Sequence, residues 1–142
     1  MKTQSLIRGG SYTDHRGTVR FLNDFDMAAV RRFYTITHDD TFTRRGWRGH
    51  QIEQRWFYAI KGSFELEIVE IDDWNLPDEE LPILLTVISA EKNEVIHLPA
   101  GFATCLRALE PDSVVVLFSD YGIENAKFDD HLWPNNYFKN KL

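Results

Sequence analysis

Short runs of apolar or alternating residues recur along the chain and are separated by turn residues. Phe64, Leu66 and Ile68 alternate with Glu65 and Glu67, as in a strand with one face on the core and the other in water. Further strands are expected at residues 18–22, 32–37, 47–50, 53–60, 83–89, 94–98, 102–106 and 113–118. Glycines and a Pro-Ala-Gly turn separate these runs, which is the spacing of a β-sandwich or barrel.

Three stretches depart from this strand pattern. Residues 24–31 are expected to form a helix of about two turns. Residues 72–81, DDWNLPDEEL, are acidic and contain Pro77, so we expect a solvated loop that joins two strands of a hairpin. The segment from Asp129 onward is too aromatic for a disordered end, and we expect it to pack on the barrel or on a second subunit.

Length and composition restrict the class of protein. The 142 residues are expected to form one domain, residues 1–142, which buries about two-thirds of its unfolded surface. Cys105 is alone, so no disulfide forms within the chain, and we expect it to be a small buried apolar residue. No stretch approaches the ~20 apolar residues of a membrane span and the N-terminus lacks a signal-peptide pattern, so a soluble, cytoplasmic protein is expected.

The net charge of −6 argues against general binding of nucleic acid, which depends on positive surface. A local basic pocket remains compatible with that charge.

Site chemistry is concentrated in residues 43–62, TRRGWRGHQIEQRWFYAIKG. Arg48 and His50 are two residues apart, so in a strand they project to the same side. In the next expected strand, Arg55 faces the side opposite to Tyr58. Cations, an imidazole and aromatic rings from neighbouring strands suit an anionic, ring-bearing small molecule. The alternative is that the arginines pair with carboxylates of the chain and the aromatic rings fill its core.

Several motifs, in their order, are similar to those of one enzyme family. They are Asp14-His15-Arg16-Gly17, FYTITH, RRGWRGH, the Glu53-Gln54 pair before Gly62, and LPAGFAT followed by SDYG. Residues 9–134 resemble the cupin-fold enzymes that act on dTDP-4-keto-6-deoxyhexoses, the 3,5-epimerases and the 3,4-ketoisomerases. The resemblance implies an all-β cupin jelly roll, in agreement with the strand pattern.

The resemblance also implies roles for individual residues. His50 or Tyr121 would move the proton next to the ketone, and His97 is an alternative acid or base. Arg48 or Arg55 would stabilise the enolate oxygen. For His50 the alternative is a partly buried structural histidine, for Tyr121 a residue of the barrel wall, and a lone strand histidine such as His97 is more often structural.

Substrate binding is expected from a second group of residues. Arg16 and Arg45 would hold the diphosphate, a task that suits a planar and permanently charged guanidinium. The alternative is that each of them pairs with an acidic neighbour. The other substrate-binding candidates are Tyr34, Arg55, Tyr58, Thr104 and Arg107.

Two positions depart from the family pattern. The first histidine of the family, its usual catalytic base, falls on Arg48, and a second histidine falls on Thr104. Arginine is a poor general base because it stays protonated. A metal-binding cupin needs several imidazoles and a carboxylate, whereas Arg48 and Gln54 stand beside a lone His50, so neither a metal nor another cofactor is expected.

The sequence therefore leaves two functions open. One is a cofactor-independent isomerase or epimerase of a nucleotide-activated 4-keto-6-deoxy sugar, in the biosynthesis of cell-surface polysaccharide. The other is a cupin that binds a nucleotide sugar or glycan without turnover, because its catalytic base has been lost. A homodimer is expected in either case, with the segment around Arg16 reaching toward the pocket of the partner.

Overall fold

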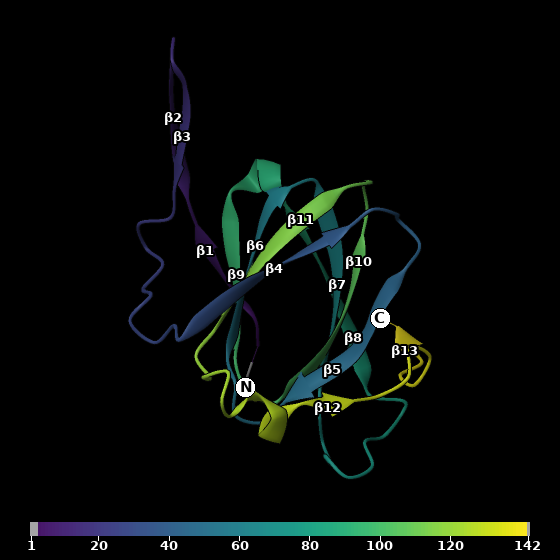
Figure 1. The fold of residues 1–142 in the computed structure, drawn as a ribbon. Helices are drawn as coiled ribbons and strands as arrows, with labels where there is room; N and C mark the ends of the chain where they lie inside the picture. Colours follow the sequence, from purple (N-terminus) through teal and green to yellow (C-terminus); the bar gives the residue numbers. More distant parts are fainter. Residues whose placement is uncertain (1–2, 142) are drawn as a thin grey trace.

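The computed structural model describes residues 3–141, whose regular secondary structure is almost entirely β-strand (Figure 1). The strands are β1 (Ser5–Arg8), β2 (Gly10–Asp14), β3 (Gly17–Phe21), β4 (Arg32–His38), β5 (Arg44–His50), β6 (Arg55–Lys61), β7 (Ser63–Glu70), β8 (Pro82–Ser89), β9 (Glu94–Leu98), β10 (Phe102–Ala108), β11 (Ser113–Ser119), β12 (His131–Leu132) and β13 (Asn140–Lys141). Every expected strand is present, with its bounds shifted by a few residues at most. Strands β1, β2, β12 and β13 were not expected.

The strands form two larger sheets and one hairpin. One sheet has the order β1-β9-β6-β11-β4 and the other the order β12-β5-β10-β7-β8-β13, and β2 pairs only with β3. All pairs are antiparallel except β13 with β8. The β2–β3 hairpin projects away from the two sheets (Figure 1), and both of its strands are largely exposed.

The hydrophobic core lies between the two sheets. Alternation along each strand supplies it: Phe57 and Ala59 come from β6, and Phe64, Leu66 and Ile68 come from β7. Each fully buried side chain of this size contributes about 1.5–3 kcal/mol. A cavity remains between the sheets along one side, where residues of β4 and β5 line it.

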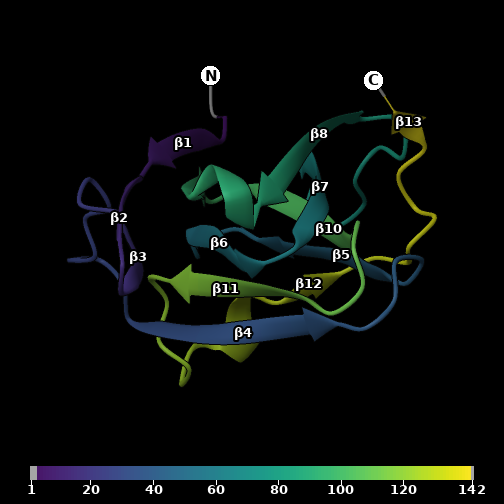
Figure 2. The ribbon, with the colours of Figure 1, turned by 90° about the horizontal axis from the view of Figure 1, so that it is seen from above.

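The C-terminal segment covers the outer face of the six-stranded sheet, as Figure 2 shows along one side of the molecule. Trp47 of β5 is fully buried there, with its ring centroid 4.9 Å from that of Phe138. The expectation that this segment packs on the barrel is thus confirmed. The same cover explains why Glu67 is 3% exposed, although the alternation of β7 predicted that it faces water.

Two glycines of β5 permit this close approach of the C-terminal segment. A Cβ atom on Gly46 would lie 1.7 Å from the side-chain oxygen of Asn135, and one on Gly49 would lie 2.9 Å from a ring carbon of Trp133. Substitution of either glycine would therefore displace the segment that forms part of the site described below.

The expected helix at residues 24–31 is wrong. The backbone there makes isolated turns, in which Phe25 N–H donates to the Leu22 carbonyl. The carboxylate of Asp26 accepts a hydrogen bond from Ala28 N–H, and such local bonds compete with a helix. The helical elements within residues 3–141 are the 3-10 turns η1 (Ala90–Lys92) and η2 (Ala126–Asp129). No helix in this part of the chain is long and apolar enough to cross a membrane.

Candidate functional site

Two adjoining cavities occupy the side of the molecule where β4 faces β5. Cavity 1 has a volume of about 570 Å³ and reaches into the space between the sheets, where Phe57 and Leu117 form part of its wall. Cavity 2 has a volume of about 680 Å³ and extends toward η2. Tyr34 and Arg48 line both cavities, so they stand at the boundary between them.

A β-bulge determines which side chains of β5 face these cavities. Between β5 and β10 the register shifts after Thr104 pairs with Arg48, so that Leu106 pairs with Arg45. The extra residue of the bulge reverses the alternation. Arg45, which is three residues before Arg48, therefore lines cavity 1 together with it.

Positive charge dominates the cavity walls although the whole chain is acidic. Cavity 1 is lined by Arg45, Arg48 and Arg55, and no carboxylate of the described residues lines it. Cavity 2 adds Arg32 and Lys127 and contains the two carboxylates of the site, Glu53 and Asp130. Cations thus line both cavities, whereas the carboxylates lie in cavity 2.

His50 is the imidazole of this site and lies on the wall of cavity 2. Its Nδ1 is 2.7 Å from the backbone carbonyl oxygen of Asp129. A carbonyl only accepts, so Nδ1 carries the proton and the lone pair of the neutral ring is on Nε2. Burial, and then the charge of Arg55, lower the pKa of His50, while Glu53 and Asp129 partly oppose this effect. The ring is therefore neutral at pH 7.

Glu53 connects several residues of the cleft, which is formed by the two adjoining cavities together. One of its carboxylate oxygens is 3.0 Å from Nη2 of Arg32. The other is 3.4 Å from Nε of Arg55 and 3.8 Å from Nε2 of His50. Arg55 also donates a hydrogen bond to the hydroxyl of Tyr34. This network fixes the inner cations and leaves Nε2 of His50 without a hydrogen-bond partner among residues 3–141.

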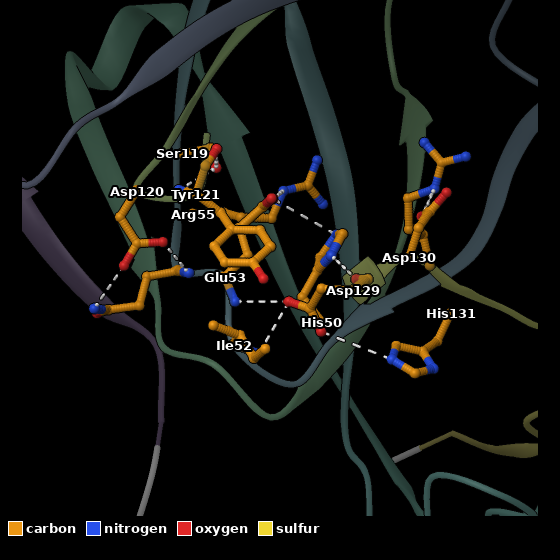
Figure 3. A network of polar contacts seen from close by, with 12 residues as sticks. His50, Ile52, Glu53, Arg55, Ser119, Asp120, Tyr121, Asp129, Asp130 and His131 are labelled. Carbon is orange, nitrogen blue, oxygen red and sulfur yellow. Dashed lines mark hydrogen bonds and ion pairs between the residues drawn. The ribbon is translucent and has the colours of Figure 1, made fainter. Parts of the chain in front are cut away.

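Asp129 holds the turn that follows His50. Its carboxylate is 1% exposed and accepts hydrogen bonds from the N–H groups of Gln51, Ile52 and Glu53, at 2.7, 2.9 and 2.8 Å (Figure 3). Its backbone carbonyl orients His50. One residue of the C-terminal segment thus positions both the imidazole and the neighbouring carboxylate.

The cleft contains six of the residues expected from the sequence: Tyr34, Arg45, Arg48, His50, Arg55 and Thr104. Arg48 and His50 share one wall, as the two-residue spacing predicted. Arg45 makes no ion pair within the described part of the chain, and its Nε donates a long hydrogen bond of 3.4 Å to Nε2 of His38.

Five other candidates lie outside both cavities. Tyr58 and His97 are on the outer face of the five-stranded sheet, where Tyr58 donates a hydrogen bond to Asn93 and His97 stacks on Trp56. The face of β6 that carries Tyr58 is opposite to the face that carries Arg55 and Phe57.

Arg107 is on the outer face of the six-stranded sheet, 2.8 Å from a carboxylate oxygen of Glu65. Arg16 is at the tip of the β2–β3 hairpin, 2.7 Å from Asp14. Tyr121 follows β11, lines neither cavity, and accepts a hydrogen bond from Arg32 through its backbone carbonyl.

Sequence reasoning missed several residues of the cleft. Arg32 could have been predicted from the sequence, because it is two residues before Tyr34 and therefore on the same face of the strand. Nothing in the sequence indicates Asp129 and Asp130 as site residues, because they belong to a segment about 80 positions beyond β5 whose path depends on tertiary packing. Within residues 3–141, no group of three or more His, Cys, Asp or Glu side chains lies close enough together to hold a metal ion.

Two facing, largely antiparallel sheets with a cleft between them are typical of a cupin jelly roll, and comparison with solved structures supports this fold class. Neither a protein-family model nor a curated relative matches the sequence. A mutant 3,4-ketoisomerase, QdtA from Thermoanaerobacterium thermosaccharolyticum in complex with TDP-4-keto-6-deoxyglucose, is similar with a TM-score of 0.69 at 14% identity, over 89% of this chain and 85% of that one.

Two further structures are similar over nearly the whole chain. The 3'-monoepimerase ChmJ from Streptomyces bikiniensis in complex with dTDP-quinovose has a TM-score of 0.72 at 17% identity, over 98% of this chain and 78% of that one. The TDP-quinovose 3,4-ketoisomerase WlaRB from Campylobacter jejuni has a TM-score of 0.70 at 12% identity, over 99% and 100%. These likenesses confirm the expected all-β cupin fold.

Proposed function

We propose that the protein is a cofactor-independent isomerase or epimerase that acts on a dTDP-linked 4-keto-6-deoxyhexose by removing a proton next to the ketone. The observation that carries this proposal is the state of His50: the ring is neutral and fixed through Nδ1, and its buried Nε2 has no hydrogen-bond partner among residues 3–141 and lies 3.8 Å from a carboxylate oxygen of Glu53, at the wall of a cationic cleft. The fold neighbours that act on or bind TDP-sugars support the substrate class.

In the proposed reaction His50 takes the proton at Nε2. The imidazolium that forms is compensated by Glu53, whose carboxylate oxygen is 3.8 Å away. Negative charge develops on the former ketone oxygen, and Arg55, which is 6% exposed, is the cation best placed by its burial to stabilise it. A proton delivered to the opposite face of the same carbon, by water or by an acid other than His50, gives the epimer. A proton delivered to the former ketone carbon, while the proton of the neighbouring hydroxyl passes to the former ketone oxygen, gives the ketoisomer.

The proposal includes a homodimer and a role in the synthesis of surface polysaccharide. The exposed β2–β3 hairpin supports the dimer, because Tyr12 and Val19 on its strands are 62% and 63% exposed. In the dimer Arg16 would reach the cleft of the partner and bind phosphate. Light scattering at micromolar concentration should give twice the chain mass, and the mass of one chain would refute this part.

A second function fits one specific observation. Arg48 occupies the place expected for a catalytic base, and Tyr121 and His97 lie outside both cavities. A cleft with several cations and one imidazole also suits a domain that binds a nucleotide sugar without turnover.

Deuterium exchange separates these functions. The protein is incubated with a dTDP-4-keto-6-deoxyhexose in D₂O, and NMR follows deuterium at C3, C4 and C5. Deuterium at C3 alone indicates 3-epimerisation, a new deuterium at C4 with C3 converted to the ketone indicates ketoisomerisation, and deuterium at C3 and C5 indicates 3,5-epimerisation. Binding without exchange supports the second function, and absence of both binding and exchange refutes the first and the second.

A further inference from the structure

An ion pair lies at the boundary between the two cavities. Nε of Arg48 is 2.9 Å from a carboxylate oxygen of Asp130, and the two side chains are 46% and 36% exposed. Arg48 lines both cavities, whereas Asp130 lines only cavity 2. The guanidinium thus stands between a carboxylate on one side and a cavity without carboxylates on the other.

We propose that Arg48 and Asp130 form an anion-operated latch, in which the diphosphate of the ligand enters cavity 1 and takes Arg48 away from Asp130. Arg45 and Arg48 then bind the diphosphate together. This role differs from enolate stabilisation, for which Arg48 is too exposed to water. The proposal deepens the proposed function and rests on it for the identity of the ligand, although anion binding can be measured without turnover.

The energetics of the groups involved favour such an exchange. An exposed ion pair contributes little to stability, so its loss costs little. A diphosphate carries more negative charge than a carboxylate and accepts bidentate hydrogen bonds from guanidinium. Arg45, which has no carboxylate partner among the described residues, adds a second cation on the same wall.

The position of Asp130 is held independently of Arg48. The preceding residue, Asp129, is anchored by three backbone N–H groups, and the following residue, His131, begins β12 on the edge of β5. Asp130 therefore stays in place while Arg48, a long and flexible side chain, changes partner. The proposed exchange therefore requires movement of the Arg48 side chain alone.

The test measures binding of inorganic pyrophosphate by calorimetry at low ionic strength. Asp130→Asn should tighten binding by about 3–10-fold, because it removes the competitor for Arg48. Arg48→Gln should weaken binding by about 10-fold, because one charge-assisted contact is lost. In the double variant Arg48→Gln/Asp130→Asn the gain from Asp130→Asn should disappear, since the two residues act through one contact.

Glu79→Gln is the matched control. Glu79 is also an exposed carboxylate in an ion pair, 3.2 Å from Lys139, and it lines neither cavity. This variant changes the net charge by the same amount and should bind pyrophosphate within twofold of the unmodified protein. Circular dichroism of all variants checks that the fold is retained.

Three results would overturn the latch: no pyrophosphate binding by the unmodified protein, equal affinity in Asp130→Asn and Glu79→Gln, or a gain from Asp130→Asn that persists without Arg48. The last result would indicate a general effect of charge. Failure of the proposed function is separate, because it appears as absent deuterium exchange with a keto sugar, whatever the pyrophosphate data show.

Discussion

The two faces of the six-stranded sheet use arginine in different ways. On the outer face, Arg44 is 2.6 Å from Glu67 and Arg107 is 2.8 Å from Glu65, and the C-terminal segment covers much of that face. On the inner face, Arg45 has no carboxylate partner among residues 3–141, and the partner of Arg48 is Asp130, whose side chain is 36% exposed. Arg44 and Arg45 are neighbours in sequence, so residue type alone does not distinguish a structural arginine from a binding one. The difference lies in whether the surroundings neutralise the charge.

The largest effect is expected at the inner face from His50→Gln. The variant should exchange the proton next to the ketone about 10²-fold or more slowly, because general acid–base catalysis typically contributes 10²–10⁴-fold. Affinity for the nucleotide sugar should stay within a few-fold. NMR in D₂O and calorimetry measure the two quantities, and undiminished exchange would remove His50 from the mechanism.

The next largest effect is expected from substitution of Arg45, and it distinguishes Arg45, a proposed binding residue, from its structural neighbour Arg44. Arg45→Ala should weaken binding of a dTDP-sugar by about 1.5–3 kcal/mol, since a charge-assisted hydrogen bond to phosphate is lost. Its melting temperature should change little. If calorimetry shows intact affinity for dTDP together with a large fall in melting temperature, Arg45 is structural.

The reverse pattern is expected for Arg44→Ala, which removes the guanidinium that holds the buried carboxylate of Glu67. Because the side chain of Arg44 is 28% exposed, solvent screening limits the loss to about 1–3 kcal/mol of unfolding free energy. Urea denaturation measures this loss, and dTDP binding serves as the control. Weakened binding without loss of stability would contradict the distinction between the faces.

The cations of the cleft should also affect the pH dependence of stability. Burial and then Arg45 lower the pKa of His38, and burial and then Arg55 lower the pKa of His50. Because these pKa values are lower in the folded state, the unfolded state binds more protons below the ordinary pKa of about 6.5. The stabilising contribution is thus present above that pH and is lost as the pH falls.

Urea denaturation at pH 7.5 and pH 5.5 measures this loss. Each histidine contributes at most about 1.4 kcal/mol per pH unit. Arg45→Ala should reduce the loss, because it removes one cause of the low pKa of His38. Stability that is independent of pH over this range would show that neither histidine resists protonation in the fold.

The smallest effect is expected from Tyr121→Phe. Tyr121 lines neither cavity, and the contacts that it makes to Arg32 and Ser119 use its backbone. The variant should keep proton exchange and sugar affinity within about twofold, as surface substitutions away from a site do. A loss comparable to that in His50→Gln would mean that the hydroxyl reaches the substrate after a movement of this segment.

Most of the strands, and the pairs of residues that share a strand face, could be predicted from the sequence alone. Alternation placed Arg48 beside His50 and separated Arg55 from Tyr58, because the direction of side chains along a strand is a local property with a period of two. The motif resemblance also anticipated the cupin fold, which the solved structures confirm.

Which of these faces is the inner one, and where the alternation is interrupted, depends on contacts between distant segments of the chain. The bulge in β5 depends on pairing with β10, and it brings Arg45 to the wall that Arg48 already lines. Asp129 and Asp130 enter the site because the C-terminal segment packs over β5, where Gly46 and Gly49 leave room for it. Charge neutralisation depends on such contacts between distant segments. The sequence therefore shows where the arginines are, and packing determines which of them remain available to a ligand.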